Sequence, residues 1–571
     1  MPTKRPLTAL AAAAALLTAC ATIEEPPPAT TITPMPGLGT ATFAVTAKDE
    51  QARAWFAQGL QLTYAFEHTE AVRVFRAALA RDPSCAMCAW GVAYAMGPNI
   101  NNPDRGPVRD IRAYIQRAQQ AAPGASPLER ALIQAMAVRY GRAPEREQQL
   151  FETQGAALCS AGKPANASQR QDRKVDPQDL GYAAAMADVL RQFPNDPDVV
   201  ALYADAVMTT MAWEWWDPKT GRANGTVADV VQRLASITRQ HPQHTGALHF
   251  YVHIAEHSPN PAQAETAADA LGTLAPGSPH LVHMGSHIYK NIGRFADGTR
   301  ANQQALEVQK TFDAMLRAQG AGGSGHWDAH HLHFLWFAAL MEGRLDLSVA
   351  TARDFARRYG DRRDGSGEYA TLLPLATLVR LGQWPAVLAE PPHTGRLGIA
   401  QGYTAYARGM AYAHTGQLAQ AKAELATLQQ QRALPTVQRA KIYGETIPAK
   451  VLTVAQHMLA GRIARTEGRP EQAIAGLREA ADLDDEFGND PPLTGGGARL
   501  ALAGALLDAG QLDEAAKQIA ESQRLGGPSA WVHQGLATLA SKRGATAEAQ
   551  RQAELARAAW RNAQGASLPG I

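Results

Sequence analysis

The feature that most constrains this chain is a repeated pairing of two alanine-rich segments around a short glycine turn. Gly416-Gln417-Leu418, for example, separates a segment that begins at Gly402 from one that contains Ala421. Alanine favours closely packed helices, whereas strand-forming Val, Ile and aromatic residues are sparse. Such a helix pair cannot bury its apolar face without a neighbour, so the pairs must stack. Further pairs span Ala455 to Ala480, Leu500 to Arg524 and Gly535 to Ala559.

The clearest unit lies near the N-terminus. It contains Trp55, Phe56, Gly59, Leu60 and Tyr64, then Ala71-x3-Phe75-x2-Ala78, and it ends at Pro83. This pattern resembles the tetratricopeptide repeat (TPR), in which W-x2-L-G-x2-Y and A-x3-F segments form two helices and proline closes the unit. The resemblance implies an all-α, TPR-like solenoid of antiparallel helix pairs.

Length and charge limit the classes of partner. The 571 residues are 46% hydrophobic and 19% charged, which is enough apolar material for several domains or one long array. Lys and Arg number 55 against 53 Asp and Glu, a formal net charge of +2, so we expect no nucleic acid partner. We predict a signal peptide over 1–19, a tether over 20–47, an N-terminal array over 48–320 and a C-terminal array over 321–565.

The first residues resemble a bacterial lipoprotein signal. Lys4 and Arg5 precede an apolar run from Leu7 to Leu17, which is too short to span a bilayer, and the run ends in Leu17-Thr-Ala-Cys20. The resemblance implies that Cys20 becomes the lipid-attached N-terminal residue, so that a lipid anchor is the only link to the membrane. Ala21, in place of an aspartate, favours the periplasmic face of the outer membrane. The alternative is a plain secreted protein.

Three segments interrupt the helical pattern. Glu24 to Gly39 is rich in Pro and Thr, and we expect it to be extended and unpacked. Gly155 to Leu180 is polar and predicts a surface loop inserted between helices. Gly320 to Gly325 is glycine-rich and marks the predicted boundary between the two arrays.

Histidines gather on two neighbouring helical segments. The first reads His249-x3-His253-x2-Glu256 and the second His280-x2-His283-x3-His287; residues at these spacings share one face of a helix. A third segment, His326-x3-His330-x2-His333, repeats the first spacing, with His331 beside it. We expect the stripes to face a common cavity on the concave side of the array.

Imidazoles at these spacings are the side chains that a transition metal needs. A mixed histidine and carboxylate set suits zinc, iron, manganese or copper, and more than four ligands allow two ions. His249, His253, His280, His283 and His287 are the predicted ligands, Glu256 a ligand or general base, and His330 and His333 second-shell or second-site groups. The alternative is a set of buried polar groups bonded to one another and to backbone. We interpret three nearby histidines as surface or capping residues: His241, His244 and His257.

The histidine motifs also resemble a widespread group of bacterial TPR proteins. The motifs are His249-Phe-Tyr-Val-His253-Ile-Ala-Glu256 and His280-Leu-Val-His283-Met-Gly-Ser-His287-Ile-Tyr289, with Gly97-Pro98-Asn99-Ile-Asn101 before them and Pro491-Pro492 after them. The resemblance implies a solenoid with the histidine stretch as its characteristic feature and attaches no reaction to it. The chain departs from the group at Gly285, where proline is usual, at His331, where asparagine is usual, and at Leu493 to Gly497.

Cysteine and tryptophan add two smaller predictions. Cys85-x2-Cys88 is interpreted as a structural disulfide or two buried thiols in preference to a redox pair, because no βαβ pattern surrounds it. Trp213, Trp215 and Trp216 predict core or lid packing, with a ligand-stacking platform as the alternative.

Two functions follow from these patterns. The first is a membrane-anchored periplasmic solenoid that binds a protein or peptide, with a histidine-rich metal site. The alternative is a metal-dependent enzyme, hydrolytic or oxidative, built on the same scaffold. The chain has no G-x-S-x-G elbow, no phosphate-binding G-x-x-x-x-G-K-[ST] loop and no H-E-x-x-H motif.

Overall fold

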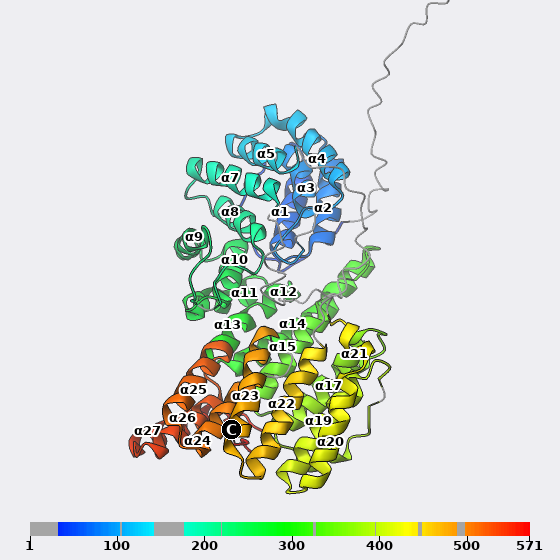
Figure 1. Cartoon of the computed structure of the whole chain (residues 1–571). Coiled ribbons are helices and arrows are strands. Elements are labelled where there is room, and N and C mark those ends of the chain that lie inside the picture. The colour runs from blue at the N-terminus through cyan, green and yellow to red at the C-terminus, as the bar shows by residue number, and fades with distance from the viewer. Residues whose placement is uncertain are drawn as a thin grey trace, which may run out of the picture.

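The chain folds into stacked antiparallel helix pairs, as the repeat pattern predicts (Figure 1). The computed structural model describes residues 32–40, 42–102, 106–141, 176–218, 220–323, 327–393, 395–442, 448–487, 491 and 497–570. Within these residues the β-structure consists of two isolated bridges. No helix of the described chain is both long and apolar enough to cross a bilayer.

The N-terminal helices form the upper half of Figure 1. The predicted unit at Trp55 is the pair α1 and α2, which confirms its two helices and its end before Pro83. The helices are α1 (Glu50–Tyr64), α2 (His68–Arg81), α3 (Ala86–Ala95), α4 (Val108–Ala121), α5 (Pro127–Tyr140), α7 (Pro177–Gln192), α8 (Pro197–Thr210), α9 (Val227–Gln240), α10 (Thr245–Glu256), α11 (Glu265–Leu274), α12 (Pro279–His283) and α13 (Gly285–Ile292).

The C-terminal helices form the lower half, and the long α14 leads into them. The predicted glycine turns at Gly416, Gly468 and Gly510 each separate two helices there. The helices are α14 (Phe295–Ala318), α15 (Asp328–Met341), α16 (Leu345–Tyr359), α17 (Gly365–Arg380), α18 (Trp384–Ala389), α19 (Ile399–His414), α20 (Leu418–Arg432), α21 (Pro435–Arg439), α22 (Pro448–Thr466), α23 (Pro470–Asp484), α24 (Ala498–Asp508), α25 (Leu512–Gly526), α26 (Ala530–Lys542) and α27 (Thr546–Ala559).

The apolar side chains form two cores, one in each half. Phe312, Leu316 and Trp327 belong to the first core, whereas Phe295 and Leu332 belong to the second. Helix α14 therefore contributes to both cores, whereas α15 belongs to the second core and Trp327 just before it to the first. The glycine-rich stretch lies between these two helices in the sequence.

The C-terminal array curves back on its own beginning. The indole Nε1 of Trp560, which follows α27, donates to the carbonyl of Met341 at the end of α15, at 3.0 Å. Gln564 exchanges backbone hydrogen bonds with Gly343 and Leu345, at 3.2 and 3.1 Å. The segment that follows the last helix pair is thus bonded to the turn between α15 and α16, which closes the C-terminal array on itself.

The expectation of an unpacked tether is wrong for residues 32–39. Ile32, Met35 and Leu38 are buried in the first core, because apolar residues recur within this Pro- and Thr-rich segment. The carbonyl of Gly37 accepts a hydrogen bond from the backbone N–H of Gly277 at 2.8 Å. The two backbone segments approach each other so closely at Gly37 and Gly277 that only glycine fits, since a side chain at Gly277 would meet the carbonyl of Pro36.

Two further predictions concern connections between helices. Cys85 and Cys88 form a disulfide at the start of α3, one of the two states that the structural interpretation allows. The predicted surface insertion ends earlier than expected, because Pro177 already begins α7 behind the capping residue Asp176. The remainder of that insertion lies outside the described residues, as do Cys20, Cys159, His326 and the departure at 493–496.

A buried imidazole cluster as candidate metal centre

The histidines come from three neighbouring segments at the junction of the two halves. His244 is the N-terminal cap of α10, because its side chain accepts a hydrogen bond from Ala247 N–H. Ser278 caps α12 in the same way, by accepting from Leu281 N–H. Helix α13 follows α12 after Met284, so the second stripe crosses a helix break. His249 and His253 lie on α10, His280 and His283 on α12, His287 on α13 and His330 on α15.

These imidazoles are buried inside the array, whereas the sequence predicts that they face a common cavity on its concave side. His249, His253, His280, His283 and His287 are 0% exposed and His330 is 1% exposed. The reason is that the imidazole rings of α10, α12, α13 and α15 contact one another, so the helix face that carries them becomes an interface between helices.

His249, His253 and His280 form a first triad, whose candidate ligand atoms all lie within 4.8 Å of one another. The Nδ1 atom of His249 lies 2.6 Å from the carbonyl oxygen of Tyr64 and must donate to it. Its Nε2 atom therefore carries the lone pair and faces Nε2 of His280 at 3.1 Å. The carbonyl at the end of α1 thus sets the tautomer that metal binding requires.

His283, His287 and His330 form a second triad under the same 4.8 Å limit. Nδ1 of His283 lies 2.6 Å from Oδ1 of Asn302, whose amide nitrogen in turn donates to the Gly298 carbonyl. His283 therefore donates from Nδ1 and presents its Nε2 lone pair to Nε2 of His287, at 2.9 Å. His330 Nε2 approaches the same His287 atom at 3.4 Å.

Glu256 links the two triads. One carboxylate oxygen accepts from Nδ1 of His253 at 2.9 Å and the other from Nδ1 of His287 at 2.6 Å. Burial alone would raise the pKa of Glu256, but the charge and hydrogen bonds of His287, His257 and His253 outweigh it and hold the pKa well below its ordinary value. The carboxylate is thus ionised and orients one imidazole in each triad.

The nitrogen spacing matches a metal coordination shell. In a tetrahedral site with metal–nitrogen bonds of about 2.0–2.1 Å, neighbouring ligand atoms are about 3.3 Å apart. The Nε2 pairs of His283 with His287, His287 with His330 and His249 with His280 lie at 2.9, 3.4 and 3.1 Å. Two lone pairs at such distances repel unless a proton or a cation lies between them.

Electrostatics keep the cluster in its ligating form. Burial, reinforced by neighbouring imidazoles, lowers the pKa of His249, His280 and His283 well below the usual 6.5. These rings are therefore neutral at pH 7, as a metal ligand must be. The two triads also adjoin each other, because the ring centroids of His253 and His287 are 5.4 Å apart and those of His280 and His283 are 6.0 Å apart.

Two aromatic residues contact the first triad, and the sequence patterns did not assign either of them to the site. Phe66 lies 4.4 Å from His249 and 5.6 Å from His253 between ring centroids, and Trp213 lies 5.5 Å from His253. They are the two non-glycine residues with positive φ in the described chain, at 59° and 65°. Such strain costs about 1–3 kcal/mol and persists where the surroundings impose it.

A sequence signal for Phe66 did exist. It stands two residues after α1 and two before α2, where the turns of the C-terminal array have Gly416, Gly468 and Gly510. Those glycines all have positive φ. Asn302 and the Tyr64 carbonyl carry no comparable signal, since an asparagine within a long helix and a backbone oxygen leave no pattern.

The other singled-out side chains have structural contacts. His333 is buried but bonds Tyr369 Oη at 3.1 Å and belongs to neither triad. His331 packs its ring 4.7 Å from that of His283. His244 is a cap as expected, but it is buried against Asp198 at 3.1 Å and is not on the surface.

Trp215 is a buried core residue, and Trp216 is partly buried against the same core. The indole Nε1 atoms of Trp215 and Trp216 donate to the carbonyls of Met208 and Ile254, at 3.0 and 2.7 Å. Gly285, the departure from proline, sits where a side chain would meet the Tyr289 ring.

No family model matches the chain, and no curated protein matches it. Among solved structures it is similar to the APC/C heterotetramer Cut9–Hcn1, the human IFIT1 dimer with m7Gppp-AAAA and yeast Tom70, at 14%, 12% and 12% identity. The similarity covers 90% of this chain each time and 94%, 90% and 97% of the other chains, with TM-scores of 0.24, 0.28 and 0.27. At these scores the likenesses identify no family.

Proposed function

We propose that this protein binds two transition metal ions, one in each imidazole triad, on a helical-repeat scaffold. The observation that carries the proposal is the 2.9 Å contact between Nε2 of His283 and Nε2 of His287. The Nδ1 atoms of both rings face acceptors, Asn302 and Glu256, so in the metal-free protein one Nε2 must hold a proton. A metal ion replaces that proton and satisfies both lone pairs.

The donor set narrows the metal. Glu256 uses both oxygens on imidazole N–H groups, so it orients His253 and His287 without binding the metal itself, and the ligands are nitrogen atoms only. Imidazole suits copper, zinc, iron and nickel, whereas manganese prefers oxygen donors. We propose copper or zinc, because copper binds such nitrogen sites most tightly in the divalent series and zinc is a common ion of sites with three imidazole ligands.

Metal analysis of the mature chain without an affinity tag tests this proposal. We expect about two ions per chain, about one in a His283→Ala/His287→Ala variant and about one in a His249→Ala/His253→Ala variant. The matched control is His414→Ala/His533→Ala, which removes two imidazoles of the C-terminal array and leaves the metal content unchanged. Circular dichroism of every variant separates loss of ligands from loss of the fold.

One result would contradict the proposal that the chain binds metal. A wild-type chain that purifies without metal, and whose melting temperature does not rise when Zn²⁺ or Cu²⁺ is added, contradicts the proposal. Ligand binding at 100 times Kd stabilises the native state by about 2.7 kcal/mol, so true binding is visible in a melting curve. His333→Gln should leave the metal content unchanged, because this residue bonds Tyr369 and is a member of neither triad.

A metal-dependent enzyme is the second candidate, and one observation favours it. Each triad supplies three ligands, the number that leaves a coordination position for a substrate or water. Complete burial of the rings restricts that position to a small molecule such as dioxygen. Oxygen consumption by the copper-loaded chain with a phenolic reductant, compared with the His283→Ala/His287→Ala variant, tests oxidative chemistry; equal rates would remove it.

The location and partner remain proposals from the sequence. We infer that lipid attached to Cys20 holds the chain at the periplasmic face of the outer membrane, and that the helical array binds a protein or peptide there. What supports them is the Leu17-Thr-Ala-Cys20 segment and the repeat architecture. Cys20→Ser should release the chain from the membrane fraction, and an unchanged distribution would argue against the anchor.

A further inference from the structure

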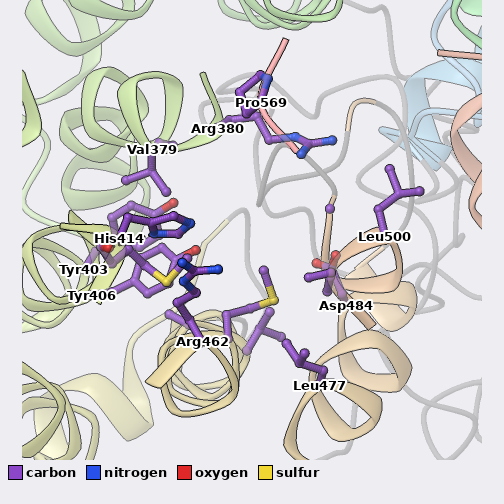
Figure 2. A pocket seen from close by; sticks show the side chains of 18 of the residues that line it. Val379, Arg380, Tyr403, Tyr406, His414, Arg462, Leu477, Asp484, Leu500 and Pro569 are labelled. Atoms are coloured by element: carbon purple, nitrogen blue, oxygen red, sulfur yellow. Dashed lines mark hydrogen bonds between the residues drawn. The ribbon is translucent and has the colours of Figure 1, made fainter. Parts of the chain in front are cut away.

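A cavity lies inside the C-terminal array, away from the histidine cluster (Figure 2). Helices α17, α19, α22, α23 and α24 surround it, and its empty volume is about 1070 Å³ including the open mouth. Ligand pockets of proteins are concavities of this kind, in which a few polar groups fix the orientation of an apolar body.

Most of the wall is apolar or aromatic. Tyr403 and Tyr406 are buried and contact each other edge to face, with ring centroids 5.2 Å apart. Trp384 stacks on His414 at 4.1 Å along the same side. Aliphatic side chains complete the lining, among them Val451, Leu477 and Leu500. Such a surface accepts a hydrocarbon chain or an aromatic ring.

Two arginines bring guanidinium groups without hydrogen-bonded partners to this wall. Arg380 comes from α17 and Arg462 from α22, and Figure 2 shows both beside the cavity. Neither guanidinium has a hydrogen bond or ion pair to any part of the described chain, and the Nε atom of each is shielded from solvent. Arg380 lies 4.0 Å from the centre of the Trp531 ring, which holds it in place but leaves its donors unused.

The charge balance of the lining is positive. Arg465 also lines the cavity, but it pairs with Asp508 at 2.6 Å, so its charge is compensated. Asp484 contributes one carboxylate to the lining, whereas Arg380 and Arg462 contribute two guanidinium groups. Buried donors without acceptors are rare in native proteins, and guanidinium matches a carboxylate with two parallel hydrogen bonds.

We propose that this cavity binds a small organic anion, a carboxylate with an aliphatic or aromatic body. The carboxylate accepts hydrogen bonds from Arg380 and Arg462, and the apolar body lies against Tyr403, Tyr406 and Leu500. Pro569 at the rim, above Arg380 in Figure 2, narrows the mouth of the cavity.

Titration calorimetry on the full mature chain tests the proposal with three probes. Octanoate and 3-phenylpropionate distinguish an aliphatic from an aromatic body, and 1-octanol is the neutral match of octanoate. We expect at least one anion to bind about tenfold or more tightly than octanol. Arg380→Gln and Arg462→Gln should each weaken that anion about tenfold or more, as loss of a charged hydrogen bond does.

Two controls make the result decisive. Arg465→Gln removes an arginine that is already paired, so it should change anion affinity less than about threefold. Ala501→Trp fills the cavity without changing its charge and should abolish binding. Equal affinity for octanol and octanoate, or anion binding that survives both arginine changes, overturns the proposal, provided that circular dichroism shows folded variants.

Discussion

At the scale of single residues, Glu256 affects both triads, because its carboxylate orients one imidazole in each of them. We predict that Glu256→Gln weakens metal binding in both triads by about 10- to 100-fold, the usual effect of losing an orienting carboxylate. A glutamine has one acceptor oxygen, so one of the two imidazoles must rotate or change tautomer. Competition with a metal-sensitive chelator measures the affinities.

A matched buried glutamate shows whether the effect is specific. Glu129 is also buried, but its carboxylate caps α5 through Ser126 N–H. Glu129→Gln should lower stability and leave metal affinity within about twofold. If Glu256→Gln binds metal as tightly as the wild type, Glu256 is not part of the metal centre.

Phe66 gives a second residue-scale prediction, which concerns backbone strain. Phe66→Ala removes a buried ring and should cost about 3–5 kcal/mol of unfolding free energy. Phe66→Gly removes the same ring but relieves the left-handed backbone, so it should be about 1 kcal/mol more stable than the alanine variant. Urea denaturation of both variants measures the difference. An alanine variant at least as stable as the glycine variant would falsify the strained turn.

At the scale of helices, a buried polar network joins four elements of the N-terminal half. Tyr94 on α3 donates to Asp205 on α8 at 2.9 Å, and Arg139 on α5 pairs with Asp179 on α7 at 2.9 Å. Burial raises the pKa of Asp205 from 3.8 to about 6, more than the attraction of Arg139 and the hydrogen bond of Tyr94 lower it. The ionised form of Asp205 is thus disfavoured in the folded protein.

The sign of the pH effect follows from this raised pKa. Between pH 3.8 and about 6 the folded chain binds a proton that the unfolded chain has lost, so stability contributed by this group falls as pH rises. We predict that the unfolding free energy of the Asp205→Asn variant, relative to that of the wild type, increases by about 1–3 kcal/mol when the pH is raised from 4.5 to 7.5. Urea denaturation of both chains at the two pH values measures this gain; the exposed Asp361→Asn should show none.

The helices also show how much of the fold and of the site can be predicted from the sequence. The glycine turns at Gly416, Gly468 and Gly510 predict the helix pairs correctly, because each glycine adopts the left-handed conformation that ends the first helix. The spacing of His280 and His283 places them on one helix, but it does not reveal that they belong to different triads. That division depends on which helices pack on either side, and no local pattern encodes it.

At the scale of the whole molecule, ring closure distinguishes the C-terminal half from an open solenoid. In an open array each repeat contacts only its neighbours, so damage to the last repeat stays local. Here Trp560 joins the last repeat to the end of α15, and Gln564 pairs with the turn that follows α15. The stability of α26 and α27 is therefore coupled to that of α15 and α16.

Trp560→Ala tests this coupling. Loss of the buried indole should cost about 3–5 kcal/mol and open the ring, because the Met341 carbonyl loses its donor and the packing on Trp531 disappears. Hydrogen exchange should then show lower protection in α15 and α16 as well as in α26 and α27. Leu555→Ala on the exposed side of α27 serves as the control and should leave α15 unchanged. Exchange that increases in α26 and α27 alone would mean that the contact at Met341 adds no stability and that the array behaves as an open stack.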